Sequence, residues 1–188
     1  MKTMKLLKAE KEDFERVRGF YHSLIDTMRE RGLPVTWVKD IYPSPDFLRE
    51  SIAAGDLYMA CLGEGGERKP AKSASIAAVM VLNHSCNDEY HTVQWGRELK
   101  DPAVMVVHAL GVHPDFGGKG IGREMINAAR EKALEAGAKA LRLDVLKSNE
   151  RAKNLYIRCG LTYRGTVQLY YENTGRQEFE MYEYLLPE

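Results

Sequence analysis

The chain has 188 residues, and its 27 Lys and Arg residues balance its 27 Asp and Glu residues, so the formal charge is zero. At this length a single domain over residues 1–188 is expected, and a composition with 44% hydrophobic and 29% charged residues excludes a disordered or fibrous chain. Proteins that bind nucleic acid usually carry a basic excess or stripe, which this balance does not supply. We therefore expect no nucleic-acid partner.

The cysteines and the N-terminus indicate the cellular compartment in which the protein is expected. Cys61, Cys86 and Cys159 are an odd number without a CxxC pair, which indicates reduced thiols rather than a disulfide framework or a zinc ribbon. The N-terminus lacks the apolar segment of a signal peptide, and no apolar stretch reaches the roughly 18–20 residues that cross a bilayer. The five histidines show no HExxH spacing. The sequence predicts a cytoplasmic protein without a membrane partner or a bound metal.

Helices and strands alternate along the sequence as in an α/β protein. Apolar residues at steps of three and four predict helices, and short apolar runs bounded by glycine or proline predict strands. In chain order the predicted elements are a strand over 3–9, helices from about 10 to 31 and from 45 to 54, strands over 57–62, 75–82 and 104–112, a helix from the glycine cluster near 120 to 136, a strand over 141–145, a helix from about 150 to 159, and a hairpin of strands over 161–171 and 178–186.

One strand, one turn and one longer loop can be predicted more specifically. Residues 76–82 are apolar at every position, which predicts a central strand buried on both faces. A turn over residues 63–70 is expected to join this strand to the one before it. The polar stretch over residues 83–102 is too long for a simple turn, and loops of this length tend to be functional. Together the elements predict one α/β domain built on a mixed sheet.

The strongest local signal is the run Gly117-Gly118-Lys119-Gly120-Ile121-Gly122, which lies between a strand and a helix. Glycines at this place let successive backbone N–H groups face one concavity at a helix N-terminus, which suits a pyrophosphate. Arg123 would add positive charge, as would the lysine of the run; a tight glycine turn without a ligand is the alternative. A Walker A loop is excluded because Gly120 follows Lys119, and a dinucleotide fingerprint because Met125 occupies the place of its third glycine.

The run from Leu110 to Arg123 resembles motif A of the GCN5-related N-acetyltransferase (GNAT) family, whose pattern is Gln/Arg-x-x-Gly-x-Gly/Ala. The run from Asn149 to Leu161 resembles motif B of that family, and the order of strands and helices is similar throughout. One departure is Gly117, which occupies the Gln/Arg position. The resemblance implies a single-domain fold with a mixed central sheet flanked by helices, in which two parallel central strands splay apart.

The resemblance also implies acetyl-CoA as the acyl donor and a set of residues that bind it. Backbone groups of the glycine run would hold the pyrophosphate, the backbone of Leu110 and Val112 would pair with the pantetheine, and Asn149 would lie near the thiol. The cofactor-binding residues implied are Leu110, Gly111, Val112, Gly117, Gly118, Lys119, Gly120, Ile121, Gly122, Arg123, Asn149 and Tyr156.

The reaction implied is the direct attack of an amine on the thioester, which requires a route for the ammonium proton and a donor for the departing thiolate. Tyr156 matches the usual acid of the family; its alternative is a core residue of the last helix. Two candidates for the general base remain open. His108 has an ordinary pKa near 6.5, and Asp144 occupies a position where some relatives that modify protein N-termini carry a Glu. Either could be structural, and a relay through ordered water would need no strong base.

The acceptor site is expected in the least regular parts of the chain, where aromatic side chains would stack on a substrate and acids would attract a cationic amine. The substrate candidates are Trp37, Tyr42, Glu89 and Tyr90, with Asp88, His91, Trp95 and Glu98 close to them in sequence. Tyrosines of the closing hairpin at 170, 171, 182 and 184 would line the contact of a homodimer.

The sequence therefore predicts an N-acetyltransferase that acts on a primary amine of a small molecule. Two alternatives stay open: acetylation of a protein or peptide N-terminus, and a non-catalytic sensor that binds acyl-CoA.

Overall fold

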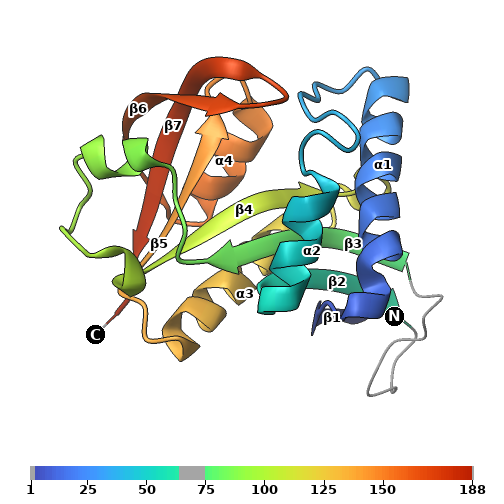
Figure 1. Ribbon diagram of the computed structural model, residues 1–188, viewed down its shortest axis with the longest axis horizontal. Coiled ribbons are helices and arrows are strands. Elements are labelled where there is room, and N and C mark those ends of the chain that lie inside the picture. Colours follow the sequence, from blue (N-terminus) through green and yellow to red (C-terminus); the bar gives the residue numbers. More distant parts are fainter. Residues whose placement is uncertain (1–2, 64–74, 188) are drawn as a thin grey trace. The chain divides into compact units, whose positions relative to one another are not determined.

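The computed structural model describes residues 3–63 and 75–187 (Figure 1). Seven strands hydrogen-bond in the order β1-β2-β3-β4-β5-β7-β6 and form the predicted mixed sheet, in which β4 and β5 run parallel. The bounds are β1 Thr3–Lys8, α1 Phe14–Glu30, α2 Pro45–Ala54, β2 Leu57–Gly63, β3 Ser75–Asn83, β4 Val104–Val112, α3 Ile121–Glu135, β5 Ala140–Leu146, α4 Glu150–Arg158, β6 Thr162–Tyr171 and β7 Gly175–Leu185.

The order of these elements agrees with the predicted order, and the differences are at their ends. A short 3-10 turn, η1 (Lys11–Asp13), precedes α1, and β7 begins at Gly175 because the hairpin turn is tighter than its sequence suggests. Residues 64–70 of the expected turn lie outside the described residues. Within the described parts of the chain, no helix is long and apolar enough to cross a membrane.

Two compact units divide the chain. Unit 1 holds the described residues of Met1–Val81 together with Ala109–Met125, and unit 2 holds Leu82–His108 together with the described residues from Ile126 onward. Consequently β3, β4 and α3 each begin in one unit and end in the other. The prediction of one domain over residues 1–188 stays a prediction.

In unit 1, α1 and α2 pack with β2 and β3 in one apolar core (Figure 1). The helical spacing of α1 buries Val17, Tyr21 and Leu24, as its sequence pattern predicts. Ser44 caps α2 as predicted, because its Oγ accepts a hydrogen bond from the backbone N–H of Phe47 at 3.1 Å. Strand β3 is buried from its third residue to its eighth, which confirms the prediction of a strand covered on both faces.

In unit 2, the loop over residues 83–102 packs its apolar residues into a core shared with the strands of that unit. It contains two 3-10 turns, η2 (Asp88–Thr92) and, at its end, η3 (Asp101–Ala103). The ring of Tyr90 is 3% exposed and packs with apolar residues of β4, β6 and β7. The indole Nε1 of Trp95 donates a hydrogen bond to the carbonyl of Tyr90 at 2.8 Å. The loop is therefore a packed element, although its sequence is polar.

A buried ion-pair network fastens this loop to the sheet of unit 2. Glu183 of β7 is 1% exposed and accepts hydrogen bonds from Arg142 Nε at 3.1 Å and Arg164 Nε at 2.9 Å. Its Oε2 also accepts from the backbone N–H of Gly96 at 2.8 Å. The Arg142 guanidinium lies 4.1 Å from the ring centroid of Trp95. The carboxylate thus joins two strands and the loop.

Candidate active site

The end of β4 in unit 1 has an irregular backbone that its neighbours hold in place. Ala109 has a φ of 49°, a left-handed conformation that residues other than glycine rarely adopt. Its carbonyl accepts a hydrogen bond of 2.7 Å from the hydroxyl of Tyr21, which is buried in α1. At Gly111 a Cβ would lie 3.0 Å from Leu24 Cδ1 and 3.1 Å from Trp37 Cζ3, so a larger residue would require these two side chains to shift. The strand is therefore distorted where the cofactor-binding residues Leu110 to Val112 are predicted.

The pairing between β4 and β5 is short, as the resemblance implies for splayed strands. The parallel register runs only from Val104 opposite Ala140 to Val106 opposite Arg142 in the described residues. Strand β5 continues to Leu146, and β7 pairs with it over that whole length. Among the described residues, the part of β4 that follows Val106 therefore has no partner in this parallel register.

Beyond β4, a glycine loop leads into α3. Gly118 and Gly120 have φ values of 75° and 79°, which favour glycine, and the carbonyl of Gly120 accepts the first helical bond from Glu124. In the described part of the chain, the first-turn N–H groups of residues 121–123 meet no acceptor. A Cβ added at Gly118 would meet no described atom within 4 Å, so the loop is uncrowded at this residue. The donors fit a pyrophosphate, which the helix dipole also favours.

His113 anchors the start of this loop, and sequence reasoning missed it. Its ring Nδ1 accepts from the backbone N–H of Asp115 at 3.3 Å, so Nε2 carries the hydrogen and donates to Ser23 Oγ of α1 at 3.0 Å. Its backbone N–H donates to the carbonyl of Ala77 at 2.9 Å. Arg31 of α1 forms an ion pair with Asp115. The signal was a single polar side chain at the end of an apolar strand, directly before a proline.

Tyr156 lies in unit 2 on α4, which begins where the sequence predicts it. Asn149 caps the helix, since its Oδ1 accepts from the backbone N–H of Ala152 at 3.2 Å. The ring of Tyr156 is 7% exposed, and its centroid lies 6.2 Å from that of Tyr182. Burial raises the pKa of Tyr156 above its ordinary value near 10, and the negative charge of Asp144 raises it further. No hydrogen bond occupies its hydroxyl within the described residues.

The two candidate bases also lie in unit 2, in different surroundings. His108 Nε2 lies 2.9 Å from Asn83 Oδ1 and 3.1 Å from the carbonyl of Ser85. Both neighbours are acceptors when the amide is oriented in this way, so Nε2 donates and Nδ1 carries the lone pair. Burial lowers the pKa of His108 to about 4, whereas the sequence suggested a value near 6.5. The imidazole is therefore neutral at pH 7 but weakly basic.

Asp144 is held by two phenols, one of which belongs to a predicted substrate residue. Tyr90 donates to Asp144 Oδ2 at 2.8 Å, and Tyr171 donates to the same oxygen at 3.1 Å. Burial raises the pKa of Asp144, and these two hydrogen bonds oppose that increase. The hydroxyl of Tyr90 is thus engaged, and its ring is packed in the core of the loop. Glu89 is half-buried beside it in η2.

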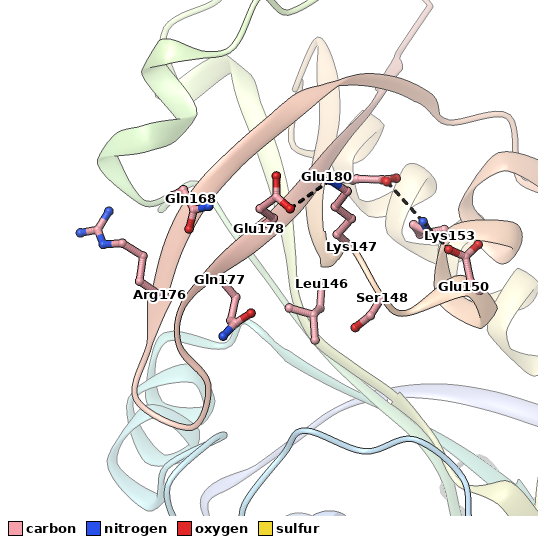
Figure 2. Close-up of a pocket in the computed structure, with 10 residues that line it drawn as sticks. All are labelled: Leu146, Lys147, Ser148, Glu150, Lys153, Gln168, Arg176, Gln177, Glu178 and Glu180. Carbon is pink, nitrogen blue, oxygen red and sulfur yellow. Dashed lines mark hydrogen bonds and ion pairs between the residues drawn. The ribbon is translucent and has the colours of Figure 1, made fainter.

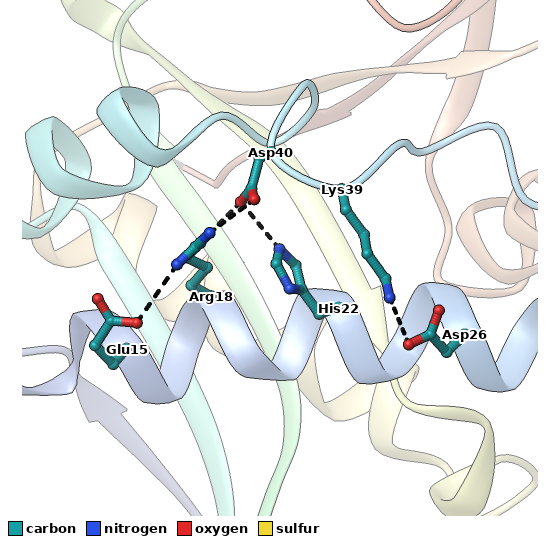
Figure 3. Close-up of polar contacts among 6 residues, drawn as sticks. All are labelled: Glu15, Arg18, His22, Asp26, Lys39 and Asp40. Atoms are coloured by element: carbon teal, nitrogen blue, oxygen red, sulfur yellow. Dashed lines mark hydrogen bonds and ion pairs between the residues drawn. The ribbon is translucent and has the colours of Figure 1, made fainter.

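The other predicted substrate residues, Trp37 and Tyr42, lie in unit 1 and pack against its core. The Trp37 ring contacts Tyr21 at 5.5 Å and Tyr42 at 6.2 Å between centroids. Their segment is held to α1 by polar contacts shown in Figure 3, where Arg18 donates two hydrogen bonds of 2.8 Å to Asp40. This guanidinium holds the pKa of the Asp40 carboxyl well below its usual range. Four substrate candidates are thus divided between the two units.

The comparisons with known proteins bear on the segment that contains β3 to α4. The family model described as acetyltransferase (GNAT) family matches residues 76–161. Residues 76–161 belong to the GNAT family. This GNAT segment includes the glycine loop, both candidate bases and Tyr156.

Three relatives show how far the similarity extends. A mycothiol acetyltransferase of Propionibacterium freudenreichii is 42% identical over 60 residues, which make up 32% of this chain but only 19% of that protein. A GNAT acetyltransferase structure from Streptococcus agalactiae has a TM-score of 0.73 at 15% identity and covers 98% of this chain and 96% of its own. Arabidopsis thaliana NAA60, solved with acetyl-CoA, has a TM-score of 0.67 at 14% identity, with 97% and 98% covered. The structural matches confirm the predicted fold of the GNAT family.

Unit 2 also contains a hollow of about 590 Å³ at the end of β5, the start of α4 and the closing hairpin (Figure 2). Two ion pairs lie in it, Lys147 with Glu178 at 2.9 Å and Lys153 with Glu180 at 3.2 Å. Sequence reasoning named none of these residues as candidates for the acceptor site. The lining residues are Leu146, Lys147, Ser148, Glu150, Lys153, Gln168, Arg176, Gln177, Glu178 and Glu180.

The closing hairpin does not present all of its predicted dimer residues to solvent. Tyr170 is 62% exposed, whereas Tyr182 is 2% exposed and packs against Tyr156 and Tyr163. A contact between two copies would therefore use the exposed tyrosine and not the buried one.

Proposed function

We propose that this protein is an acetyl-CoA-dependent N-acetyltransferase that acetylates a primary amine of a small molecule. The observation that carries the proposal is the glycine loop of the GNAT segment, where the free N–H groups of residues 121–123 follow the distorted end of β4. When bound, acetyl-CoA supplies an activated acetyl thioester. Its presence in the NAA60 structure supports the same choice of donor here.

The loop would hold the pyrophosphate through its backbone. Gly118 and Gly120 allow the turn, and the N–H groups of α3 donate to the anion. The exposed side chains of Lys119 and Arg123 add positive charge beside these donors. Gly117 replaces the usual Gln or Arg, and the contacts of His113 supply support from α1 instead.

Tyr156 would supply the proton that the leaving sulfur requires. Its raised pKa keeps the phenol protonated at neutral pH, and its hydroxyl is free to donate. The two base candidates suit proton removal less well, because His108 has a pKa of about 4 and Asp144 accepts from two phenols. We therefore assign the ammonium proton to a water relay.

The hollow of unit 2 supports a small acceptor. Its volume of about 590 Å³ falls within the roughly 300–1,000 Å³ that small-molecule sites occupy. Lys153 lines the hollow, and Tyr156 follows three residues later on the same face of α4. The charged lining suits a polar amine, whose ammonium would compete for Glu150, Glu178 or Glu180.

The test is thiol release from acetyl-CoA across amines, polyamines, amino acids, aminoglycosides and short peptides, with calorimetric binding of acetyl-CoA measured in parallel. Turnover on a small amine supports the proposal, whereas turnover on peptides alone refutes the small-molecule acceptor. Tight binding without turnover on any acceptor would favour the sensor.

A matched pair of variants tests the loop. Gly120→Glu places a negative charge beside the predicted anion site and should abolish acetyl-CoA binding. Gly137→Glu introduces the same side chain at a glycine with a similar φ, 74° against 79°, beyond the other end of α3, and should bind acetyl-CoA normally. Normal acetyl-CoA binding by both variants would show that the glycine loop is only a turn.

A further inference from the structure

The loop over residues 83–102 brings together three side chains with different metal-ligating atoms. Cys86 Sγ, His91 Nε2 and a carboxylate oxygen of Asp101 all lie within 4.8 Å of one another. They come from the start, the middle and the end of the loop. Their separations of five and ten residues match no common metal motif, which is why sequence spacing predicted no metal.

The contacts of His91 orient its ring toward the other two. Nδ1 lies 3.2 Å from the backbone carbonyl of Asp88, which only accepts, so Nδ1 carries a hydrogen. Nε2 then faces Asp101 Oδ1 at 3.0 Å and Oδ2 at 3.2 Å. Because ionised carboxylate oxygens also only accept, Nε2 in this tautomer either carries a proton or binds a metal ion. A carbonyl on the far nitrogen is the arrangement that orients metal-binding histidines.

Cys86 adds a third potential ligand beside this pair. A proton shared by His91 and Asp101 needs no sulfur, yet the half-buried thiol lies beside both groups. A tetrahedral ion with bonds of about 2.0–2.3 Å separates its ligands by about 3.3–3.8 Å, so that only small movements are needed. Thiolate, imidazole and carboxylate together are typical ligands of zinc.

We propose that Cys86, His91 and Asp101 form a zinc site that closes the 83–102 loop. Water occupies the fourth position, since the cluster supplies three protein ligands. Binding replaces the thiol proton and any proton on Nε2, and both pass to solvent. The ion stabilises the turn η2, whose Tyr90 holds Asp144. The role is structural and does not depend on the proposed transferase activity.

The experiment uses the full chain, stripped with a chelator and then titrated with Co²⁺ and Zn²⁺. Co²⁺ should give a thiolate-to-cobalt charge-transfer absorption, and Zn²⁺ should raise the Tm and bind with one ion per chain by calorimetry. Cys86→Ser should remove the absorption and weaken Zn²⁺ binding by at least about tenfold, since even the loss of an outer-sphere hydrogen bond to a metal ligand has that effect. Cys159→Ala, which removes a buried thiol of α4's C-terminal end, should keep both signals.

Two results overturn the proposal. If the unaltered chain gives neither the absorption nor a heat of Zn²⁺ binding, the cluster is a histidine–aspartate pair that shares a proton. If the absorption persists in Cys86→Ser, another cysteine binds the ion. Circular dichroism checks that Cys86→Ser is folded; if it is not, His91→Asn decides, with a tenfold loss of Zn²⁺ affinity expected and an unchanged affinity refuting the site.

Discussion

Removal of Glu183 tests whether the buried ion-pair network holds unit 2 together. Glu183→Ala deletes the acceptor of three hydrogen bonds, from Arg142, Arg164 and Gly96, at 2.8 to 3.1 Å. The Arg142 side chain, which is 6% exposed, would then remain buried without its carboxylate. Breaking a buried pair by removing one partner costs about 3–5 kcal/mol. We expect the free energy of unfolding to fall by that amount.

The control is Glu178→Ala, because both residues lie on β7 and both form ion pairs. The Glu178 side chain is 49% exposed and pairs with Lys147, so its loss should cost only about 0–1 kcal/mol. Glu183→Gln keeps an acceptor oxygen without the charge and should fall between the two. Urea unfolding followed by circular dichroism measures all three variants. A loss below about 1 kcal/mol in Glu183→Ala, or one equal to that of Glu178→Ala, would refute the reasoning.

Three further variants test the site. Tyr156→Phe should lower kcat by about 10–1,000-fold in the thiol-release assay with little change in acetyl-CoA affinity, as expected for loss of a proton donor. The control is Tyr163→Phe, at a ring that is 50% exposed, which should keep full activity. Normal turnover in Tyr156→Phe would remove Tyr156 from the mechanism. The depressed pKa of His108, about 4 in the folded chain, means that the unfolded chain takes up a proton first as the pH falls from about 6.5, so stability is lost over this window. The free energy of unfolding should therefore fall by roughly 2–3 kcal/mol less in His108→Gln than in the unaltered chain between pH 7 and pH 4.5, as measured by urea unfolding. An identical pH dependence in both proteins would contradict the lowered pKa of His108. Tyr21→Phe leaves the buried carbonyl of Ala109 without its donor and should cost about 1–3 kcal/mol, again by urea unfolding; a change below about 0.3 kcal/mol would show that the bond contributes little.

Local chemistry explains why much of the fold could be predicted from sequence. The caps Ser44 and Asn149 act within three residues of themselves, and the glycines that end helices need no distant partner. The glycine loop after β4 is likewise a property of consecutive residues, because positive φ angles and a helix start suffice to create it. These features therefore carried both the element order and the resemblance to the GNAT family.

The roles of individual polar residues depended on partners far away in sequence. The basicity of His108 is set by burial and by its contacts with Asn83 and Ser85, about 25 residues earlier. The occupation of Asp144 by two phenols, from a loop and from β6, has no signature near residue 144. Such pKa values depend on desolvation and neighbouring charges, which periodicity does not encode.

What the sequence by itself determined is the set of local elements and the glycine loop, since hydrophobic spacing, caps and turns act over a few residues. Only the tertiary structure decided which polar groups are buried and paired. Glu183 shows the reason. It lies in a strand of mixed polarity, and its carboxylate becomes paired only when folding brings Arg142 and Arg164 to it from other strands. Long-range contact creates that low-dielectric surrounding. The folding of the 83–102 loop likewise brings Cys86, His91 and Asp101 together, although five and ten residues separate them in sequence.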